Sequence, residues 1–487
     1  MNQKKTRGYT QYFLKGFKFN ALNVSFSLVL SLFSALIIYN KLEDSQFIFY
    51  SVSQITIYFF VSLSNLEFGK LVSKYFPNLN KDICNTVLKK LILTSLFVLL
   101  IGFIIFYVVS EYFGIYSYFE NYKNLFYIYV FFSSVIQIIS NYFGQYLAAY
   151  QKFDEQEKQY SLFSIPLKAL GLLFFYFLFG NIYFILFVNF LVRIVNLVIT
   201  FKISDFNLGN KLYTKDYVKE LEMFSTKSNI KFTLKNFIFF NYPLFFFSYL
   251  PIYLANFHNE NDIAVLSLSI SLFNAIKPIL NGIHKIINPS IQQLKKGGDF
   301  KKLFSIVNLL HNAVSVITAL VIISLWSILN YSIFTDIIFI KFSFNLFSDL
   351  AITAVILSLF FILNMIYHSY FLSINLENSI FKSSILGVLA SISLWLNYEN
   401  LGLKINLSLI IILTFYLTTL IYFYLVSREL LGKNILYSLL TFIIYLFALN
   451  TLFYNSLIIF LLLNGATLFL SYIFLQSNIK KYTSDSI

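Results

Sequence analysis

Residues 182–201 read IYFILFVNFLVRIVNLVITF, an apolar run that is long enough to cross a lipid bilayer as one helix. The polar side chains of this run share one face of the helix, because they recur at i, i+4, i+7 and i+11: Asn189, Arg193, Asn196 and Thr200. An ionisable residue inside a membrane span is costly and is a candidate for function by default. This stretch therefore predicts a membrane helix that carries an arginine on a polar stripe.

The remainder of the chain has the same apolar character. Of its 487 residues, 58% are hydrophobic and 12% are charged, whereas a soluble domain carries about 25% charged residues. Most of this apolar surface must face lipid, which excludes a water-soluble globular protein and a disordered chain. Cys84 is the only cysteine, so the chain has neither a disulfide framework nor a cysteine metal cluster. The composition predicts an all-α polytopic membrane protein.

Hydropathy predicts about fourteen transmembrane helices, each long enough to cross a hydrocarbon core of about 30 Å. The expected spans are 19–39, 47–66, 91–109, 125–147, 161–179, 182–201, 236–254, 263–286, 303–325, 350–372, 380–396, 407–425, 435–448 and 457–475. Because the number of spans is even, both chain termini are expected on the same side of the membrane.

The basic residues set the orientation of these spans. Of the 36 Lys and Arg residues, few fall on the expected outer loops: Lys41, Lys123, Lys341 and Lys404. This bias follows the positive-inside rule and places both termini in the cytoplasm. The net charge of +14 is then explained by topology and by attraction to anionic inner-leaflet lipids, and nucleic-acid binding is not expected.

A polar segment over 202–231 divides the chain, and its few apolar residues recur at helical spacing. We expect this segment to be an amphipathic linker on the cytoplasmic interface. Six spans precede it and six follow it, so both halves enter the membrane from the same side, as in a parallel repeat. The expected N-terminal lobe, linker, C-terminal lobe and two-helix appendage with its tail are 1–201, 202–231, 232–426 and 427–487.

Cations lie inside the expected spans, whereas no aspartate or glutamate lies in the middle of any span. The intramembrane cations are Lys168, Arg193, Lys277 and Lys285. Without a carboxylate partner they would be intolerable facing lipid, so we expect them to line a water-filled cavity that suits an anionic cargo. Lys168 and Lys285 have an alternative role, because each side chain can instead snorkel to the inner headgroups.

Uncharged polar residues accompany these cations. Stripes at helical spacing along several spans supply candidate cavity residues: Asn23, Gln54, Asn189, Asn196, Asn274 and Asn281. Asparagine and serine also join helices in any membrane bundle, and for each stripe alone that explanation is preferred. The stripes centred on Arg193 and Lys277 favour cavity lining, because joining helices does not require a cation.

Prolines and titratable groups suggest moving parts. The candidate hinges are Pro243, Pro251 and Pro278, since each frees a backbone carbonyl, although static kinks are the alternative. Glu67 and His284 are candidates for carrying a coupling proton, and the membrane potential or a cargo gradient is the alternative. No cofactor, metal site or nucleotide-binding loop is expected, and the acids Glu260 and Asp262 are interpreted as an ordinary solvated loop.

Short motifs next to two of the spans point to a family. Residues 64–70 read SNLEFGK and are followed by Lys74 and Tyr75, which gives an acid-x-Gly and a basic-aromatic pair after the second span. Residues 288–290 read NPS after the eighth span, and KGGD follows over 296–299. With its topology, the sequence resembles the multidrug/oligosaccharidyl-lipid/polysaccharide exporter superfamily, and most of all its O-antigen and capsular polysaccharide flippase branch.

This resemblance implies two six-helix lobes around a central cationic cavity that opens to each face in turn. The implied cargo is an undecaprenyl-diphosphate-linked oligosaccharide, moved from the inner to the outer leaflet of a bacterial cytoplasmic membrane. Its diphosphate would meet Arg193 and Lys277, its sugar would occupy the polar stripes, and its prenyl tail would remain in lipid. A polysaccharide polymerase and chain-length proteins are the implied protein partners. The chain departs from many relatives in having few buried arginines, and Lys277 supplies the span-eight charge.

Two other functions compete with a flippase. A drug or cation antiporter of the same superfamily would be expected to carry a carboxylate in mid-membrane, and none is visible. An integral-membrane polysaccharide polymerase or glycosyltransferase would need a large outer loop, and the longest expected one runs only from about 330 to 349. The sequence therefore favours a transporter over an enzyme, and a flippase among transporters.

Overall fold

The computed structural model describes residues 30, 34, 37–66, 68–76, 81–113, 119–150, 152–204, 206, 233, 236–239, 241–243, 360–361, 363–368, 370–371, 376–397 and 407–431. All regular structure in these ranges is helical, which agrees with the all-α composition. The chain forms two compact units, residues 1–290 and 291–487. Residues 202–204 of the expected linker form the end of α8 (Ile182–Ser204), and beyond them only Phe206 of the linker is described, so the four-part division of the chain stays a prediction.

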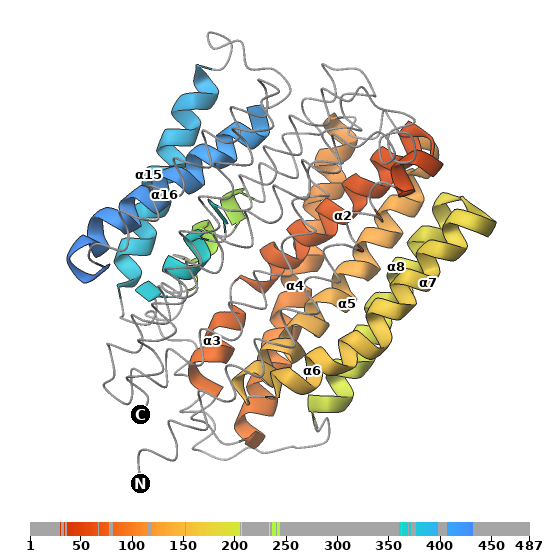
Figure 1. Cartoon of the computed structure of the whole chain (residues 1–487), viewed down its shortest axis with the longest axis horizontal. Helices are drawn as coiled ribbons and strands as arrows, with labels where there is room; N and C mark the ends of the chain where they lie inside the picture. Colours follow the sequence, from red (N-terminus) through yellow and green to blue (C-terminus); the bar gives the residue numbers. More distant parts are fainter. Residues whose placement is uncertain are drawn as a thin grey trace, which may run out of the picture. The chain divides into compact units, whose positions relative to one another are not determined.

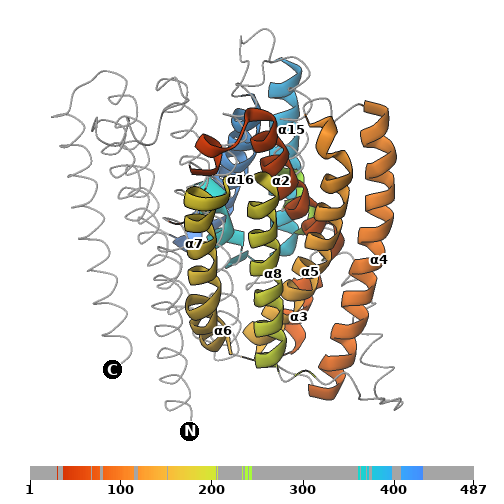
Figure 2. The same cartoon turned by 90° about the vertical axis from the view of Figure 1, so that its right-hand side faces the viewer.

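The first unit is a bundle in which one helix, α5, contacts most of the others (Figures 1 and 2). Helix α5 packs against α2, α4 and α8, while α7 packs against α8. The described helices are α2 (Asp44–Asn65), α3 (Phe68–Tyr75), α4 (Lys81–Phe113), α5 (Lys123–Ala149), α6 (Phe153–Gln159), α7 (Ile165–Phe174) and α8 (Ile182–Ser204). The central position of α5 explains why its polar residues have partners on several helices.

Six helices of the described part of the chain are long and apolar enough to cross a membrane. Five lie in the first unit and coincide with the second to sixth expected spans. The observed helix ends differ most from the expected span ends in α4, which covers Lys81–Phe113, whereas hydropathy predicted a span over 91–109. A helix of 33 residues is about 50 Å long and exceeds the hydrocarbon core. Its polar first turns, with Asp82, Lys89 and Lys90, escape a hydropathy scan because only the apolar middle scores.

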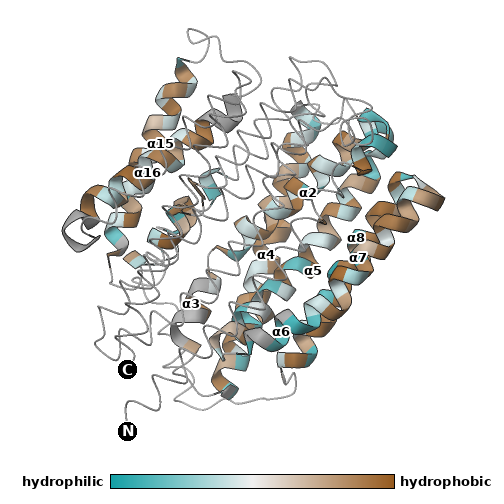
Figure 3. Ribbon diagram, in the orientation of Figure 1, coloured by the Kyte–Doolittle hydropathy of each residue, from teal (hydrophilic) through white to brown (hydrophobic). Residues whose placement is uncertain are grey.

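Large apolar side chains cover the outside of the first unit. On α4 the exposed residues include Leu93, Phe97, Leu100, Ile101, Ile104, Ile105 and Val108. Hydropathy colouring shows the same apolar character along α7 and α8, whereas the short α6 is polar (Figure 3). An apolar surface of this extent is stable against lipid and not against water. The chain is a multi-pass membrane protein.

The fifth span combines an α-helix with two π-helical turns. Helix α7 is preceded by a π-helix, Tyr160–Ser164, and followed by a second one, Phe175–Phe179. Pro166 is the second residue of α7, which continues the preceding π-helix without a break, so its missing N–H leaves a carbonyl of the preceding turn without that helical donor. The sequence predicted a single continuous span over 161–179, and a hydropathy window cannot distinguish π from α turns.

In the second unit the described helices α15 (Glu377–Leu396) and α16 (Leu407–Leu431) lie side by side (Figure 1). They fall on the expected spans 380–396 and 407–425. Gly387 lets the two helices approach closely, since a Cβ there would lie 2.8 Å from Cδ2 of Phe415. Buried Asn364 donates to the carbonyls of Phe360 and Tyr416, both at 2.8 Å, and accepts from Thr419 at 2.6 Å. Small and hydrogen-bonding residues are the usual contacts between membrane helices.

Among the described glycines, Gly171 marks the closest contact between α7 and α8. A substitution at this position tests how tightly the two helices pack. A Cβ on Gly171 would overlap Cγ1 of Val188, so Gly171→Ala should lower the free energy of unfolding by about 1–3 kcal/mol. The measurement is thermal unfolding of the purified chain in detergent. Gly102→Ala is the matched control, because its Cβ would make an ordinary 3.4 Å contact with Leu63.

Adding Val188→Ala to Gly171→Ala should recover most of the loss, because it removes the atoms that the new methyl group meets. Equal unfolding midpoints for Gly171→Ala and Gly102→Ala would contradict this packing.

Candidate functional site

Arg193 lies inside the first unit, where α2, α5 and α8 meet. Its side chain is only 9% exposed. Nη1 donates to Oε1 of Gln137 on α5 at 3.0 Å, and Nη2 donates to Oε1 of Gln54 on α2 at 2.6 Å. The arginine of α8 is thus held by one acceptor from each of the two neighbouring helices, and both acceptors are uncharged.

A second hydrogen bond fixes the orientation of each glutamine. Nε2 of Gln54 donates to the hydroxyl of Tyr129 at 2.9 Å, and Nε2 of Gln137 donates to Oδ1 of Asn141 at 3.1 Å. Because the amide nitrogens are engaged elsewhere, both amide oxygens face the guanidinium. We call Gln54 and Gln137 the amide clamp. The clamp satisfies two donors of Arg193 and leaves its positive charge uncancelled.

The charge of Arg193 has no carboxylate beside it in the described part of the chain. Its Nε is buried and has no hydrogen-bond acceptor there. The cation of Lys168 on α7 is close enough for the two positive charges to repel each other. A buried donor without an acceptor costs about 1–3 kcal/mol, so a feature of this kind needs an explanation. An anion brought next to Arg193 would provide both the acceptor and the countercharge.

The stripe on α8 contacts other elements on both sides of Arg193. Asn189, one turn before it, donates to the hydroxyl of Tyr50 on α2 at 3.1 Å. Asn196 accepts a short hydrogen bond from Ser164 in the π-helix before α7. These two contacts join helices, which is what uncharged polar residues do in many membrane bundles. Their expected role as cavity residues stays a prediction.

Among the residues predicted from sequence, the structure therefore brings Arg193 and Gln54 into direct contact and places Asn189, Asn196 and Lys168 around them. Pro243 is buried, and its role as a hinge stays a prediction. The remaining predicted residues lie outside the described part of the chain: Asn23, Glu67, Pro251, Asn274, Lys277, Pro278, Asn281, His284 and Lys285.

The residues that sequence reasoning missed lie on α5 and α2. Gln137 is one half of the clamp, and Asn141 and Tyr129 orient its two glutamines, but no polar stripe was predicted on the fourth span. A signal was present, because polar residues recur there every four positions: Tyr129, Ser133, Gln137, Asn141 and Gln145. Tyr50 on α2, which was not singled out from the sequence, accepts from Asn189 through its hydroxyl.

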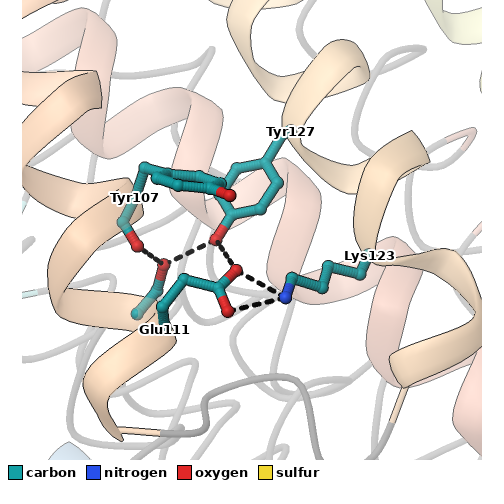
Figure 4. A network of polar contacts seen from close by, with 5 residues as sticks. Tyr107, Glu111, Lys123 and Tyr127 are labelled. Carbon is teal, nitrogen blue, oxygen red and sulfur yellow. Dashed lines mark hydrogen bonds and ion pairs between the residues drawn. The ribbon is translucent and has the colours of Figure 1, made fainter.

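A second charged cluster shows what a compensated cation looks like in the same unit (Figure 4). Nζ of Lys123, at the start of α5, lies 2.6 Å from each carboxylate oxygen of Glu111, near the end of α4. The hydroxyl of Tyr127 donates to Glu111 at 3.4 Å and shares a 2.8 Å bond with Ser110. The partly exposed Lys123 is paired with an acid, whereas the buried Arg193 is held by amides.

No protein-family model and no curated protein matches the sequence. Solved structures nevertheless share its fold. A eukaryotic MATE transporter, AtDTX14, is similar with a TM-score of 0.60 at 10% identity, covering 89% of this chain and 98% of that one. The lipid II flippase MurJ, in an inward closed conformation, gives 0.53 at 13% identity and covers 96% and 99%. A MOP superfamily transporter from Pyrococcus furiosus gives 0.54 at 14% identity and covers 88% and 96%.

The chain therefore has the fold of these polytopic membrane transporters, among which are both a lipid flippase and multidrug resistance carriers. These structural neighbours are transporters and not enzymes. The arrangement in two six-helix lobes stays a prediction.

The uncompensated charge of Arg193 leads to a prediction about stability. Burying an ion costs several kcal/mol, so Arg193→Gln, which keeps a hydrogen-bonding side chain and removes the charge, should unfold at the wild-type temperature or higher. Gln54→Leu keeps the charge and removes an acceptor, and should lower the free energy of unfolding by about 1–3 kcal/mol. Thermal unfolding in detergent measures both. A large loss for Arg193→Gln together with none for Gln54→Leu would contradict this account.

Proposed function

We propose that this protein is a flippase of the multidrug/oligosaccharidyl-lipid/polysaccharide exporter superfamily. Its cargo is an undecaprenyl-diphosphate-linked oligosaccharide, an O-antigen or capsule repeat unit, which it moves from the inner to the outer leaflet of a bacterial cytoplasmic membrane. The observation that carries the proposal is the buried Arg193, which is held by amides and has no acid beside it among the described residues. A site of this polarity suits a phosphate group and disfavours an organic cation.

The charge of Arg193 determines how much free energy is needed to close the transporter with and without its cargo. A cationic interior is expensive to enclose in lipid, so an empty transporter resists closing around it. A bound diphosphate neutralises the interior and lowers the cost of closure, which couples cargo binding to the change of access. In this proposal Arg193 supplies charge from the first lobe, and Lys277 and Lys285 supply it from span eight. The sugar lies along the polar stripes and the prenyl chain stays in lipid.

The comparisons support the proposal at the level of fold. The likeness to the lipid II flippase extends over 96% of this chain. For the Pyrococcus protein, a binding pocket of reversed polarity has been taken to suggest a different function. Polarity in the interior is therefore a reasonable basis for assigning cargo within this fold. Glu67 or His284 would carry a coupling proton, or the membrane potential and the cargo gradient would suffice. A polysaccharide polymerase and chain-length proteins would take over the exported unit.

A drug or cation antiporter is the second candidate, because a eukaryotic MATE transporter shares the fold with a TM-score of 0.60. That function calls for an intramembrane carboxylate to bind a cation. In the described part of the chain the Arg193 site contains none, which favours the flippase.

The first test is the sidedness of lipid-linked oligosaccharide in cells depleted of this protein. We expect cargo to accumulate on the inner leaflet and to return to the outer leaflet when the protein is expressed again. Unchanged sidedness with long polymer missing would identify a polymerase instead. Unchanged sidedness and polymer together with increased drug sensitivity would identify an antiporter.

Charge at position 193 is tested in the same cells. Arg193→Gln should reduce outward transfer roughly tenfold or more, because the anionic cargo loses a countercharge, whereas Arg193→Lys should retain more of it. Protein levels are compared by immunoblot. Normal transfer by Arg193→Gln would show that this arginine does not contact the cargo.

A further inference from the structure

The amide clamp is unusual because carboxylates of the same shape would bind the guanidinium more strongly. A charge-assisted bond between arginine and a carboxylate is about twice as strong as a bond to a neutral acceptor. Glutamate and glutamine differ in one non-hydrogen atom, so glutamate fits wherever Gln54 or Gln137 fits. The distances of 2.6 and 3.0 Å to Arg193 would suit a carboxylate equally well. If the only role of these positions were to join α8 to α2 and α5, glutamate would serve better.

We propose that Gln54 and Gln137 are specificity-determining residues, which hold Arg193 in place while keeping the site positive and therefore selective for anionic cargo. This inference rests on the proposed function, because it assumes that the cargo is anionic. One carboxylate in the clamp would cancel the charge of Arg193, and a second would offset that of the neighbouring Lys168, which leaves no net positive charge at the site. Whether the site binds an anionic or a cationic cargo thus depends on the acceptors around the arginine as much as on the arginine itself.

The surroundings of the clamp support this role. Each glutamine is oriented by a second bond, from Gln54 to the Tyr129 hydroxyl and from Gln137 to Asn141. These partners also tolerate a carboxylate, since a tyrosine hydroxyl can donate and an asparagine amide can turn its NH₂ group toward an oxygen. A glutamate variant therefore keeps its hydrogen bonds and gains an ion pair. Such a variant therefore tests the effect of charge without a loss of packing.

The chain provides a matched control for α2. Gln46 lies two turns before Gln54, and its Nε2 donates to the hydroxyl of Tyr122 at 3.0 Å, as Gln54 donates to that of Tyr129. Eight residues of helix place it about 12 Å away along the axis. Gln46→Glu therefore adds the same charge to the same helix, beside the same kind of partner, without touching Arg193.

The experiment uses the purified full chain in lipid nanodiscs, with inorganic diphosphate as the anionic probe and tetraphenylphosphonium as the cationic probe. Binding is measured by calorimetry and folding by the unfolding temperature. We expect the wild type to bind diphosphate, and Gln54→Glu and Gln137→Glu to bind it roughly tenfold or more weakly at undiminished unfolding temperatures. The double variant should bind diphosphate more weakly than either single variant. Gln46→Glu should bind diphosphate within about twofold of the wild type.

The outcomes separate this inference from the function on which it rests. Wild-type affinity for diphosphate in both single glutamate variants overturns the clamp proposal and leaves the anionic function standing. A wild type that binds the phosphonium and not diphosphate overturns the anionic function, and the clamp proposal with it. If one glutamate variant fails to fold, the other gives the same test from a different helix, because Gln54 is on α2 and Gln137 is on α5.

Discussion

A positive charge buried in a membrane protein must be given hydrogen-bond acceptors, and the first unit is organised around that requirement. Arg193 on α8 takes its acceptors from α2 and α5, so the contacts that satisfy the guanidinium also tie three helices together. The acceptors are neutral, which leaves the free energy of the buried charge only partly compensated. A charge retained at such a cost is more readily explained by a ligand than by stability.

Tyrosine hydroxyls on α5 extend this polar scaffold along the bundle. Tyr127, Tyr142 and Tyr146 are bonded to Ser110, Ser95 and Asn85 of α4 at 2.8, 2.7 and 3.1 Å. Tyrosine suits this position because its ring packs as a hydrophobic side chain and its hydroxyl satisfies a polar group on the neighbouring helix. The high aromatic content of the chain therefore supplies specific helix contacts as well as apolar bulk, and it holds α5 at the centre of the unit.

The sequence predicted the helices well and the site only in part. Apolar runs of about 20 residues located α2, α5, α7 and α8, because a membrane requires that length and composition. The ends of α4 were missed, since its polar turns extend beyond the apolar core. Periodicity placed Arg193 and Gln54 on polar faces, but a periodic pattern does not say which faces meet. Gln137 could be recognised as a partner only once α5 was seen to pack against α8.

The amide clamp also has a genetic consequence. Glutamine codons, CAA and CAG, become the glutamate codons GAA and GAG when their first base changes. Each position of the clamp is thus a single nucleotide substitution from a carboxylate, and neither change alters the length or shape of the side chain. One such substitution cancels the charge of Arg193, and a second offsets that of the neighbouring Lys168. A lineage with this junction can therefore explore sites of different polarity by point mutation, with the helix bundle around them left intact.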